Sequence, residues 1–222
     1  MQAPTHRTGR HATMLPNQQT ASCRTSSPFA NVLWLLVDLA ADYFIDSVTI
    51  LTTLYQCEFV LFNSKMNKFV TGATDRNATP VRGEYFLCGQ YQTPLPSAGY
   101  YATKCNANLP ALRYVIVQQV ALGYTYLQVC ELFVYAAENS ASKFWYKLRN
   151  YRLLHAPLES STNRSSINSC ILDCVMVACD FINYNETTNA CEMLVHPFGY
   201  PGLDGNIMTP ALGWNYWQLL YA

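Results

Sequence analysis

The sequence predicts a mainly β protein in two parts, a β-sandwich or barrel followed by a small α+β segment. Half of the 222 residues are apolar or aromatic and only 13% are charged, which suffices for a sizeable core. Up to about residue 136, short runs of β-branched and aromatic residues alternate with Asp, Asn, Gly and Pro turns. Beyond residue 140 a helical pattern precedes a hairpin pattern.

The strands expected in the first part are short and separated by turn residues, and no convincing helix interrupts them. This spacing is typical of an all-β sandwich or barrel. The strongest signals are the last two of the series. The expected strands are 34–39, 43–51, 59–62, 67–70, 113–117 and 127–135.

The second part is expected to contain one helix, at 167–178, with Ser165 and Ser166 before it as capping residues. A hairpin should follow, with strands at 180–184 and 191–195 around a polar turn. The residues expected on one face of the helix, at helical spacing, are Ile171, Cys174, Val175 and Ala178.

Charge and hydropathy exclude several classes of protein. Fourteen basic and fourteen acidic residues give no net charge, and no block is strongly basic, so nucleic acid is not an expected partner. The longest apolar run, 32–37, ends at Asp38, so no segment should span a bilayer as a helix. The first twenty residues lack the apolar core of a secretory signal. We therefore expect that the true start lies upstream or that the gene model is cut.

Nine cysteines are many for a chain with enough apolar residues for a core, and they indicate disulfides in an oxidising compartment. Sequons at Asn77, Asn163 and Asn185 agree with a secreted glycoprotein. The cysteines are at positions 23, 57, 88, 105, 130, 170, 174, 179 and 191.

Four cysteines gather in the second part. Cys170 and Cys174 should project from one helix face, one turn apart, with Cys179 just past the helix and Cys191 in the hairpin. Two bridges could then join the helix to the hairpin. The alternative is a zinc site built from these thiolates with His196. The absence of a Cys-x2-Cys knuckle and the expected compartment favour disulfides.

This second part resembles the PAN or apple domain, over residues 144–222. The resemblance implies a two-cysteine helix packed on a small sheet, with pairs Cys170–Cys191 and Cys174–Cys179. It makes residues 137–143 a linker. The residues that carry it are Cys170-x3-Cys174-x4-Cys179-x-Phe181-x2-Tyr184, Cys191-Glu192-Met193 and the closing Trp214-Asn215-Tyr216-Trp217.

The first part, residues 17–136, resembles the coagulation-factor C-type, discoidin-like jelly roll, and within it the F-type lectins (fucolectins). The resemblance implies bridges Cys23–Cys130 and Cys88–Cys105, leaving Cys57 unpaired and residues 1–16 as a poorly defined N-terminal segment. The residues that carry it are Trp34-Leu35-Leu36-Val37-Asp38-Leu39, Tyr43-x-Ile45-x2-Val48-x-Ile50, Cys88-Gly89, Cys105, Arg113-Tyr114-Val115 and Leu127-x2-Cys130-Glu131-Leu132-x-Val134-Tyr135.

The lectin resemblance also implies a structural calcium held by Glu131, the Cys130 carbonyl and Ser22, since oxygen ligands suit this hard cation. The family's further ligands come from an Asn/Asp-rich loop, replaced here by residues 8–17 without an acid. Alternation along 127–135 puts Glu131 on the face opposite Cys130, with Val129. The alternative is a Glu on the exposed face of an edge strand.

This chain lacks the residues that bind fucose in the family, so we assign no ligand-binding residues to it. The family uses a His after the first Cys and two Arg in a second segment, but here Cys23 precedes Arg24-Thr25-Ser26 and residues 53–60 contain no Arg. Hydrogen-bond donors to a sugar cannot be replaced by Leu and Val without loss. An alternative candidate for sugar binding is an aromatic platform of five tyrosines, Tyr91, Tyr100, Tyr101, Tyr124 and Tyr126.

The expected function is extracellular recognition or adhesion, with glycans or cell-surface proteins as partners and calcium as the sole implied cofactor. The alternative is a structural or assembly protein that has lost sugar binding. The sequence contains no plausible acid–base pair, HExxH, GxSxG or glycine-rich phosphate loop, so an enzyme is not expected.

Overall fold

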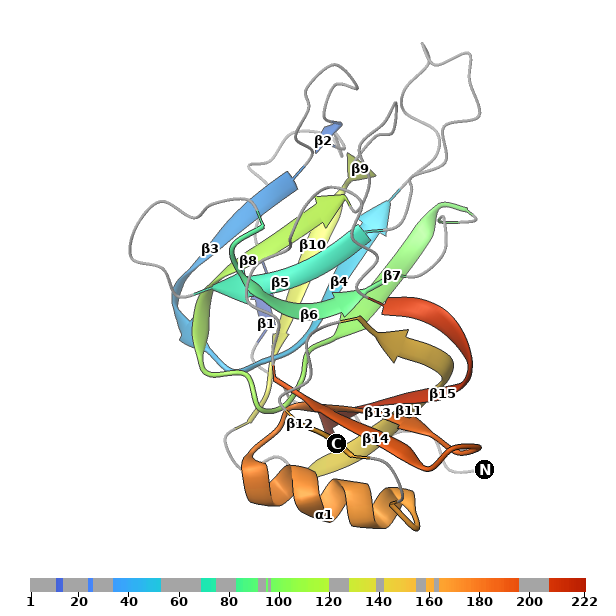
Figure 1. The fold of residues 1–222 in the computed structure, drawn as a ribbon. Helices are drawn as coiled ribbons and strands as arrows, with labels where there is room; N and C mark the ends of the chain where they lie inside the picture. Colours follow the sequence, from blue (N-terminus) through green and yellow to red (C-terminus); the bar gives the residue numbers. More distant parts are fainter. Residues whose placement is uncertain are drawn as a thin grey trace, which may run out of the picture.

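The computed structural model describes residues 11–13, 24–25, 34–52, 69–74, 83–91, 95, 97–119, 128–138, 142–154, 159–161, 164–195 and 208–222. These residues form antiparallel sheets and one helix, which confirms the mainly β fold class (Figure 1). The expected strand at 59–62 lies outside the described residues.

The first half consists of two four-stranded sheets that face each other. One has the order β1-β10-β4-β7 and the other β3-β8-β5-β6, while β2 and β9 form a separate short pair. The strands are β1 (His11–Thr13), β2 (Arg24–Thr25), β3 (Trp34–Tyr43), β4 (Ile45–Thr52), β5 (Phe69–Thr74), β6 (Phe86–Gln90), β7 (Gly99–Lys104), β8 (Leu112–Gln119), β9 (Gln128–Val129) and β10 (Glu131–Ala136).

Alternation along β4 and β8 fills the space between these sheets. Val48 and Ile50 on β4, and Val115 and Val117 on β8, are all 0% exposed and belong to one apolar cluster. The intervening Thr49 of β4 is half-buried on the other face. The period of two is what a strand with one face on a core requires.

The expected strand at 127–135 is interrupted at Cys130, where the chain bends between β9 and β10. Val129 is 6% exposed and packs in the core, as does Leu132, whereas Glu131 is exposed. The expectation that Val129 shares a face with Glu131 is therefore wrong, because the bend resets the alternation.

The second half is a five-stranded antiparallel sheet of order β11-β15-β13-β14-β12, with helix α1 packed against it. The expected helix and hairpin are confirmed to within a residue or two. The elements are β11 (Lys143–Leu153), β12 (Glu159–Ser161), α1 (Ile167–Val177), β13 (Phe181–Asn185), β14 (Ala190–Leu194) and β15 (Met208–Tyr221).

Local chemistry sets the ends of α1. The Ser166 hydroxyl accepts a hydrogen bond from the Ser169 amide at 3.3 Å, and Ala178 ends the helix in the left-handed region at φ 56°. The buried residues of the helix are Cys170 and Cys174. Val175 is 66% exposed and Ala178 is exposed past the helix end, so the expectation that both share one face with buried Cys174 is wrong.

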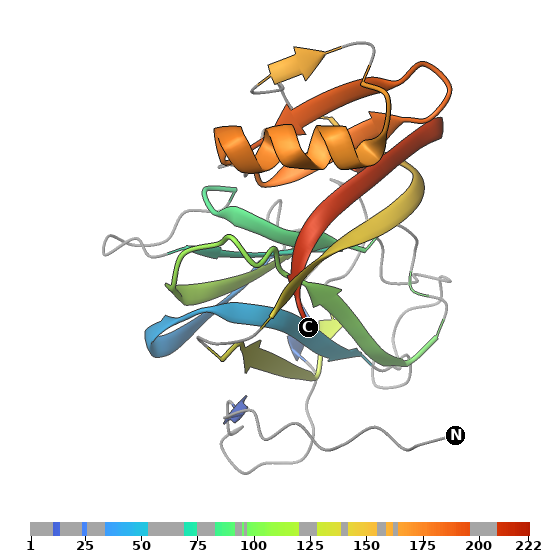
Figure 2. The same cartoon turned by 90° about the horizontal axis from the view of Figure 1, so that it is seen from below.

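The C-terminal sheet lies between α1 and the sandwich (Figure 1), and in the view from below the helix lies in front of this sheet (Figure 2). Ile182 of β13 packs under the helix, while its neighbour Phe181 packs on the opposite face. That opposite face forms one apolar cluster with the sandwich residues Tyr85, Leu87 and Ile116.

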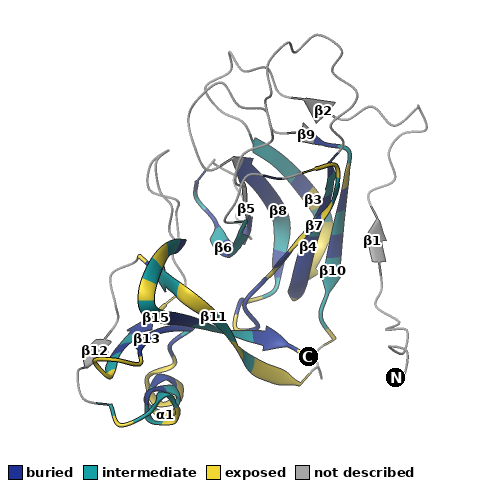
Figure 3. Ribbon diagram, turned by 90° about the vertical axis from the view of Figure 1, so that its right-hand side faces the viewer, coloured by how far each residue is buried: buried dark blue, intermediate teal, exposed yellow. Residues whose placement is uncertain are grey.

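Two hydrogen bonds add to this contact between the halves. The Ala107 amide donates to the Leu219 carbonyl at 2.7 Å, and the buried Asn106 side chain donates to the Asp180 carbonyl at 2.7 Å. Figure 3 shows buried stretches in the strands of both the sandwich and the second sheet, and the shared cluster joins them. The segment expected as a linker, 137–143, thus joins two halves that are packed together.

Candidate functional site

An exposed aromatic surface lies on the outer face of the β1-β10-β4-β7 sheet. Leu51 on the central strand β4 pairs with Tyr100 of β7 on one side and with Glu131 of β10 on the other. In the adjacent row Thr49 pairs with Phe133. These residues project outward because their neighbours on β4 fill the core.

Tyr100 is the most exposed aromatic residue of this face. Its side chain is 66% exposed, and its ring centroid lies 6.0 Å from that of half-buried Phe133, with the planes at 51°. Leu51 is also half-buried, and Glu131 is exposed. We call Tyr100, Leu51, Phe133 and Glu131 the outer-face patch.

The patch lies at one end of the sheet. Strand β4 ends at Thr52, whereas β7 begins at Gly99 and β10 at Glu131, so these three strand ends lie side by side. The β2–β9 pair lies at the same end (Figure 1). Residues 53–60, which correspond to the second fucose-binding segment of the resembled family, lie outside the described residues.

The described members of the tyrosine platform considered from the sequence do not form one exposed surface. Tyr101 is 8% exposed, donates its hydroxyl to the Ser97 carbonyl at 2.7 Å and packs edge-on against Tyr91 with centroids 5.3 Å apart. Of the expected set, Tyr100 alone is exposed among the described residues, and Tyr124 and Tyr126 lie outside them.

The expected calcium ligands fall only partly within the described chain. Cys130 is disulfide-bonded, its amide donates to the Leu51 carbonyl at 2.8 Å, and Glu131 is exposed beside it. Ser22 lies outside the described residues. The described residues contain no group of three His, Cys, Asp or Glu side chains placed to hold a metal ion. Calcium at Ser22, Cys130 and Glu131 stays a prediction.

Three of the four disulfides that the resemblances imply are present. Cys88 is joined to Cys105 (Cα–Cα 3.9 Å), Cys170 to Cys191 (6.0 Å) and Cys174 to Cys179 (4.9 Å). The four cysteines of the second half are therefore not available as zinc ligands. His196, the further residue of the zinc alternative, lies outside the described residues.

The fourth bridge, Cys23–Cys130, stays a prediction. The cysteines left for Cys130 are Cys23 and Cys57, both outside the described residues. Arg24 pairs with Val129, the residue next to Cys130, which favours Cys23 as the partner.

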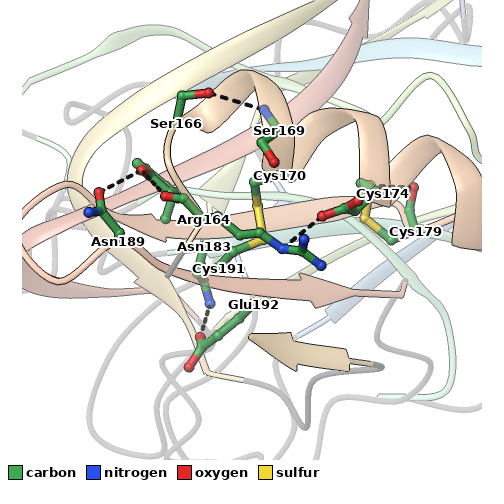
Figure 4. The surroundings of a disulfide bond; sticks show 12 residues. Arg164, Ser166, Ser169, Cys170, Cys174, Cys179, Asn183, Asn189, Cys191 and Glu192 are labelled. Atoms are coloured by element: carbon green, nitrogen blue, oxygen red, sulfur yellow. Dashed lines mark hydrogen bonds and ion pairs between the residues drawn. A yellow bond between two sulfur atoms is a disulfide. The ribbon is translucent and has the colours of Figure 1, made fainter. Parts of the chain in front are cut away.

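Cys170–Cys191 joins α1 to strand β14 of the sheet beneath it, and Cys174–Cys179 joins the helix to the residues that lead into β13 (Figure 4). Arg164, before the helix, forms an ion pair with Asp173 of α1 at 2.9 Å between Nε and Oδ2. Tyr184 of β13 donates its hydroxyl to the Arg164 carbonyl at 3.2 Å. Covalent and polar contacts together hold a helix that buries few side chains.

A buried polar network under β14 was not expected from the sequence. Asn183 is 0% exposed, and its side chain exchanges two 2.9 Å hydrogen bonds with the backbone of Leu153 and donates to Glu192 at 3.0 Å. Glu192 in turn accepts from the Arg152 guanidinium, which lies 4.3 Å over the Trp214 ring. Its groups bind one another, so the network stabilises the fold. An Asn within an otherwise apolar strand was the one signal available.

The sequon residue Asn185 is 8% exposed. Its Oδ1 accepts from the amides of Thr187 and Thr188 at 2.9 and 3.0 Å, closing the β13–β14 turn. Asn77 and Asn163 lie outside the described residues. Glycosylation at the three positions stays a prediction.

The one helix within the described residues is too short to cross a membrane.

Comparisons with known proteins give distant matches only. No family model and no curated protein matches the chain. A serum f-lectin (fucolectin) from striped bass, Morone saxatilis, has a TM-score of 0.41 at 14% identity, over 89% of this chain and 82% of that one.

Two further solved structures match about half of the chain. The lectin binding domain of Lectinolysin, as a mutant complexed with Lewis b, has a TM-score of 0.37 at 15% identity, over 51% of this chain and 70% of that one. CBM32-1 from a family 31 glycoside hydrolase of Clostridium perfringens has a TM-score of 0.38 at 14% identity, over 50% of this chain and 74% of that one. The matches are to lectin and carbohydrate-binding-module domains, and none of the three is described as a PAN or apple domain. Similarity at this level assigns no family.

Proposed function

We propose that this is an extracellular recognition protein that binds glycans through the outer-face patch. The observation that carries the proposal is the 66% exposed side chain of Tyr100, whose ring lies beside that of Phe133 on the outer face of the sheet. Exposed apolar surface rimmed by polar groups is typical of binding sites.

The chemistry of the patch suits a sugar. A pyranose has an apolar C–H face that packs on an aromatic ring, and hydroxyls that need hydrogen-bond partners. Tyr100 offers such a ring and a phenol that both donates and accepts, while the Glu131 carboxylate accepts. A rigid sheet face keeps both groups in place without an entropic cost of ordering loops.

Fucose binding in the manner of the resembled lectins is not part of this proposal, because the His and both Arg of that site are absent from the sequence. A ligand that binds only the native state raises its melting temperature. Added fucose should therefore leave the melting temperature unchanged, and a clear rise would contradict this point.

The cysteine pattern supports the remaining parts of the proposal. Three disulfides among the described residues suit secretion. The helix bridged to a small sheet supports an apple-like module in the second half, for contacts with proteins or glycans. A calcium held by Glu131, Cys130 and Ser22 would lie at the end of the patch.

A glycan array with calcium and with chelator tests the proposal. We expect binding to at least one glycan at micromolar strength in the wild type and its loss in Tyr100→Ala. If calcium is bound near Glu131, the chelator should weaken the signal. An array without any binding would contradict the proposal.

The second candidate is an assembly protein without sugar binding. It is favoured by the exposed outer side of α1, where Leu172, Val175 and Met176 are 65%, 66% and 82% exposed. No binding on the array, together with a dimer linked through Cys57, would support this candidate instead.

A further inference from the structure

Strand β11 is a long open edge of the C-terminal sheet. Among the described residues it pairs with β15 alone, although it is eleven residues long. The edges β1, β6, β7 and β12 have three to six residues each. Edge strand β3 has ten, but its pairing becomes irregular after Asp38 and Ala40 has φ 64°. In β11 the register shifts between Arg149 and Tyr151, where Asn150 has φ 57°, so its regular run is residues 143–149. An unpaired edge of this length is a template for another strand.

The register shows which backbone groups of β11 point outward. The Ala222 amide donates to the Ser142 carbonyl at 2.8 Å, so these opposite residues form a hydrogen-bonded pair. In an antiparallel ladder hydrogen-bonded pairs recur at every second residue. Phe144, Tyr146 and Leu148 therefore direct their amides and carbonyls to β15. The residues whose backbone groups face outward, with no partner among the described residues, are Lys143, Trp145, Lys147 and Arg149.

The charge of this edge selects the kind of partner. Strand β11 contains Lys143, Lys147, Arg149 and Arg152 and no acidic residue, and three of these four cations occupy outward-pairing positions. Arg149 is exposed and has no ion-pair partner among the described residues. Two copies of β11 would place like charges side by side, which disfavours self-association. Lys147 pairs with Glu186, Arg152 pairs with Glu192, and the Lys143 ammonium donates to the Ala107 carbonyl at 2.8 Å. Arg149 is therefore the cation left for an added strand, and an acidic side chain beside it would meet complementary charge.

The opposite face of the same edge is aromatic. Phe144 and Tyr146 are each 45% exposed, and they alternate with the cationic positions. An added strand would therefore find cations on one face and aromatic rings on the other. Alternation of acidic and apolar side chains fits both faces at once.

We propose that β11 binds an extended acidic segment of a partner protein, which adds as a sixth strand to the C-terminal sheet. Main-chain hydrogen bonds to Trp145, Lys147 and Arg149 hold the segment, and an acidic side chain of the segment lies beside Arg149. The site is separate from the outer-face patch and does not depend on glycan binding.

The test uses the whole chain and a synthetic peptide in which Glu and Val alternate, with a Lys-Val peptide of the same pattern as the control. Fluorescence anisotropy should show binding of the Glu-Val peptide only. Hydrogen exchange should show the amides of Trp145, Lys147 and Arg149 becoming protected. Tyr100→Ala should not change this binding, which separates the result from the glycan proposal.

Two substitutions at Arg149 separate the backbone from the charge. Arg149→Pro removes an outward amide that β15 does not use, and proline is tolerated at such edge positions. It should lower the affinity for the Glu-Val peptide about tenfold more than Arg149→Ala does, because Arg149→Ala keeps the amide. Arg149→Glu keeps the amide as well and should reverse the preference toward the Lys-Val peptide.

Three outcomes would overturn the proposal. They are failure of the Glu-Val peptide to bind the wild type, equal binding of both peptides, and binding without protection of the β11 amides. Equilibrium sedimentation gives a fourth test, because a dimer of the chain that protects these amides would make a second copy the occupant.

Discussion

The two halves of the molecule are stabilised by different chemistry. Buried side chains between the sandwich sheets are mostly Val, Ile and Leu, and the Cys88–Cys105 bridge belongs to the same cluster. Cys130 is a further disulfide-bonded residue of this half. The cluster under α1 instead consists of Cys170, Cys174, Cys179 and Cys191 with a few larger residues. Aliphatic packing holds the first half, whereas covalent bonds hold the helix of the second.

The difference follows from how much surface each half can bury. Two facing sheets bury one side of every strand, which removes a large apolar area from water. Helix α1 has eleven residues, a length that is marginal in isolation, and only two of them are buried. A short helix that turns Leu172 and Met176 to solvent needs cross-links to remain docked.

The cluster shared by both halves should have the largest effect on stability. Phe181 is 1% exposed, and its ring stacks on Tyr216 with centroids 5.5 Å apart. Phe181→Ala should lower the free energy of unfolding in urea by about 3 to 5 kcal/mol, the usual cost of such a cavity. Phe144→Ala, at a 45% exposed position, is the control and should cost far less. Equal losses in the two variants would contradict the shared core.

The paired substitution Cys170→Ala/Cys191→Ala should cost about 3 kcal/mol, as expected for a loop of this size. Amide exchange in α1 should accelerate while the sandwich strands stay protected. The control is Cys88→Ala/Cys105→Ala, whose bridge has a similar sequence separation, 17 against 21. If amide exchange in the sandwich accelerates in the control as much as exchange in α1 does in the test pair, the contrast between the halves is wrong.

The buried Asn183 network should come next in size. Asn183→Leu leaves the Leu153 amide and carbonyl unpaired, which should cost about 1 to 3 kcal/mol by thermal or urea unfolding. Asn168→Leu on the exposed side of α1 is the matched control and should change stability by less than about 0.5 kcal/mol. A neutral Asn183→Leu would mean that the network is dispensable.

The smallest expected effect is a pH dependence in the second half. The hydrogen bond from Lys147 lowers the pKa of Glu186. A lowered folded pKa means that the contribution is complete above the ordinary pKa of Glu and disappears as pH falls through the lowered value. Surface pairs contribute below about 1 kcal/mol. Lys147→Met should remove this part of the acid dependence of unfolding, and an unchanged pH profile would argue against the pair.

Local patterns predicted some elements of both halves. Runs of β-branched and aromatic residues located β4 and β8, and a serine cap with helical spacing located α1. Strands β6 and β7 were missed, because Gly89 and Gln90 in the one and Gly99 in the other weaken the strand pattern. The bend at Cys130 was also missed, because the strand signal runs through it without a break. The bend lies where the chain leaves the β2–β9 pair and enters β10.

Contacts between distant segments could not be predicted in the same way. The outer-face patch depends on the register of β4 with both β7 and β10, which brings Tyr100, Leu51 and Glu131 into one row from three parts of the chain. The shared core of the halves likewise joins Ile116 to Phe181. Sequence spacing carries no information on such register, and alternation alone gives only the face.

Titration calorimetry with the best glycan from the array tests the central claim most directly, by comparing an exposed tyrosine in each half. Tyr100→Ala should weaken binding by at least about tenfold, the loss of one aromatic contact of about 1.4 kcal/mol. Tyr146→Ala, a 45% exposed tyrosine on β11, should bind as the wild type does. Unchanged affinity in Tyr100→Ala, or an equal loss in both variants, would contradict glycan recognition by the outer-face patch.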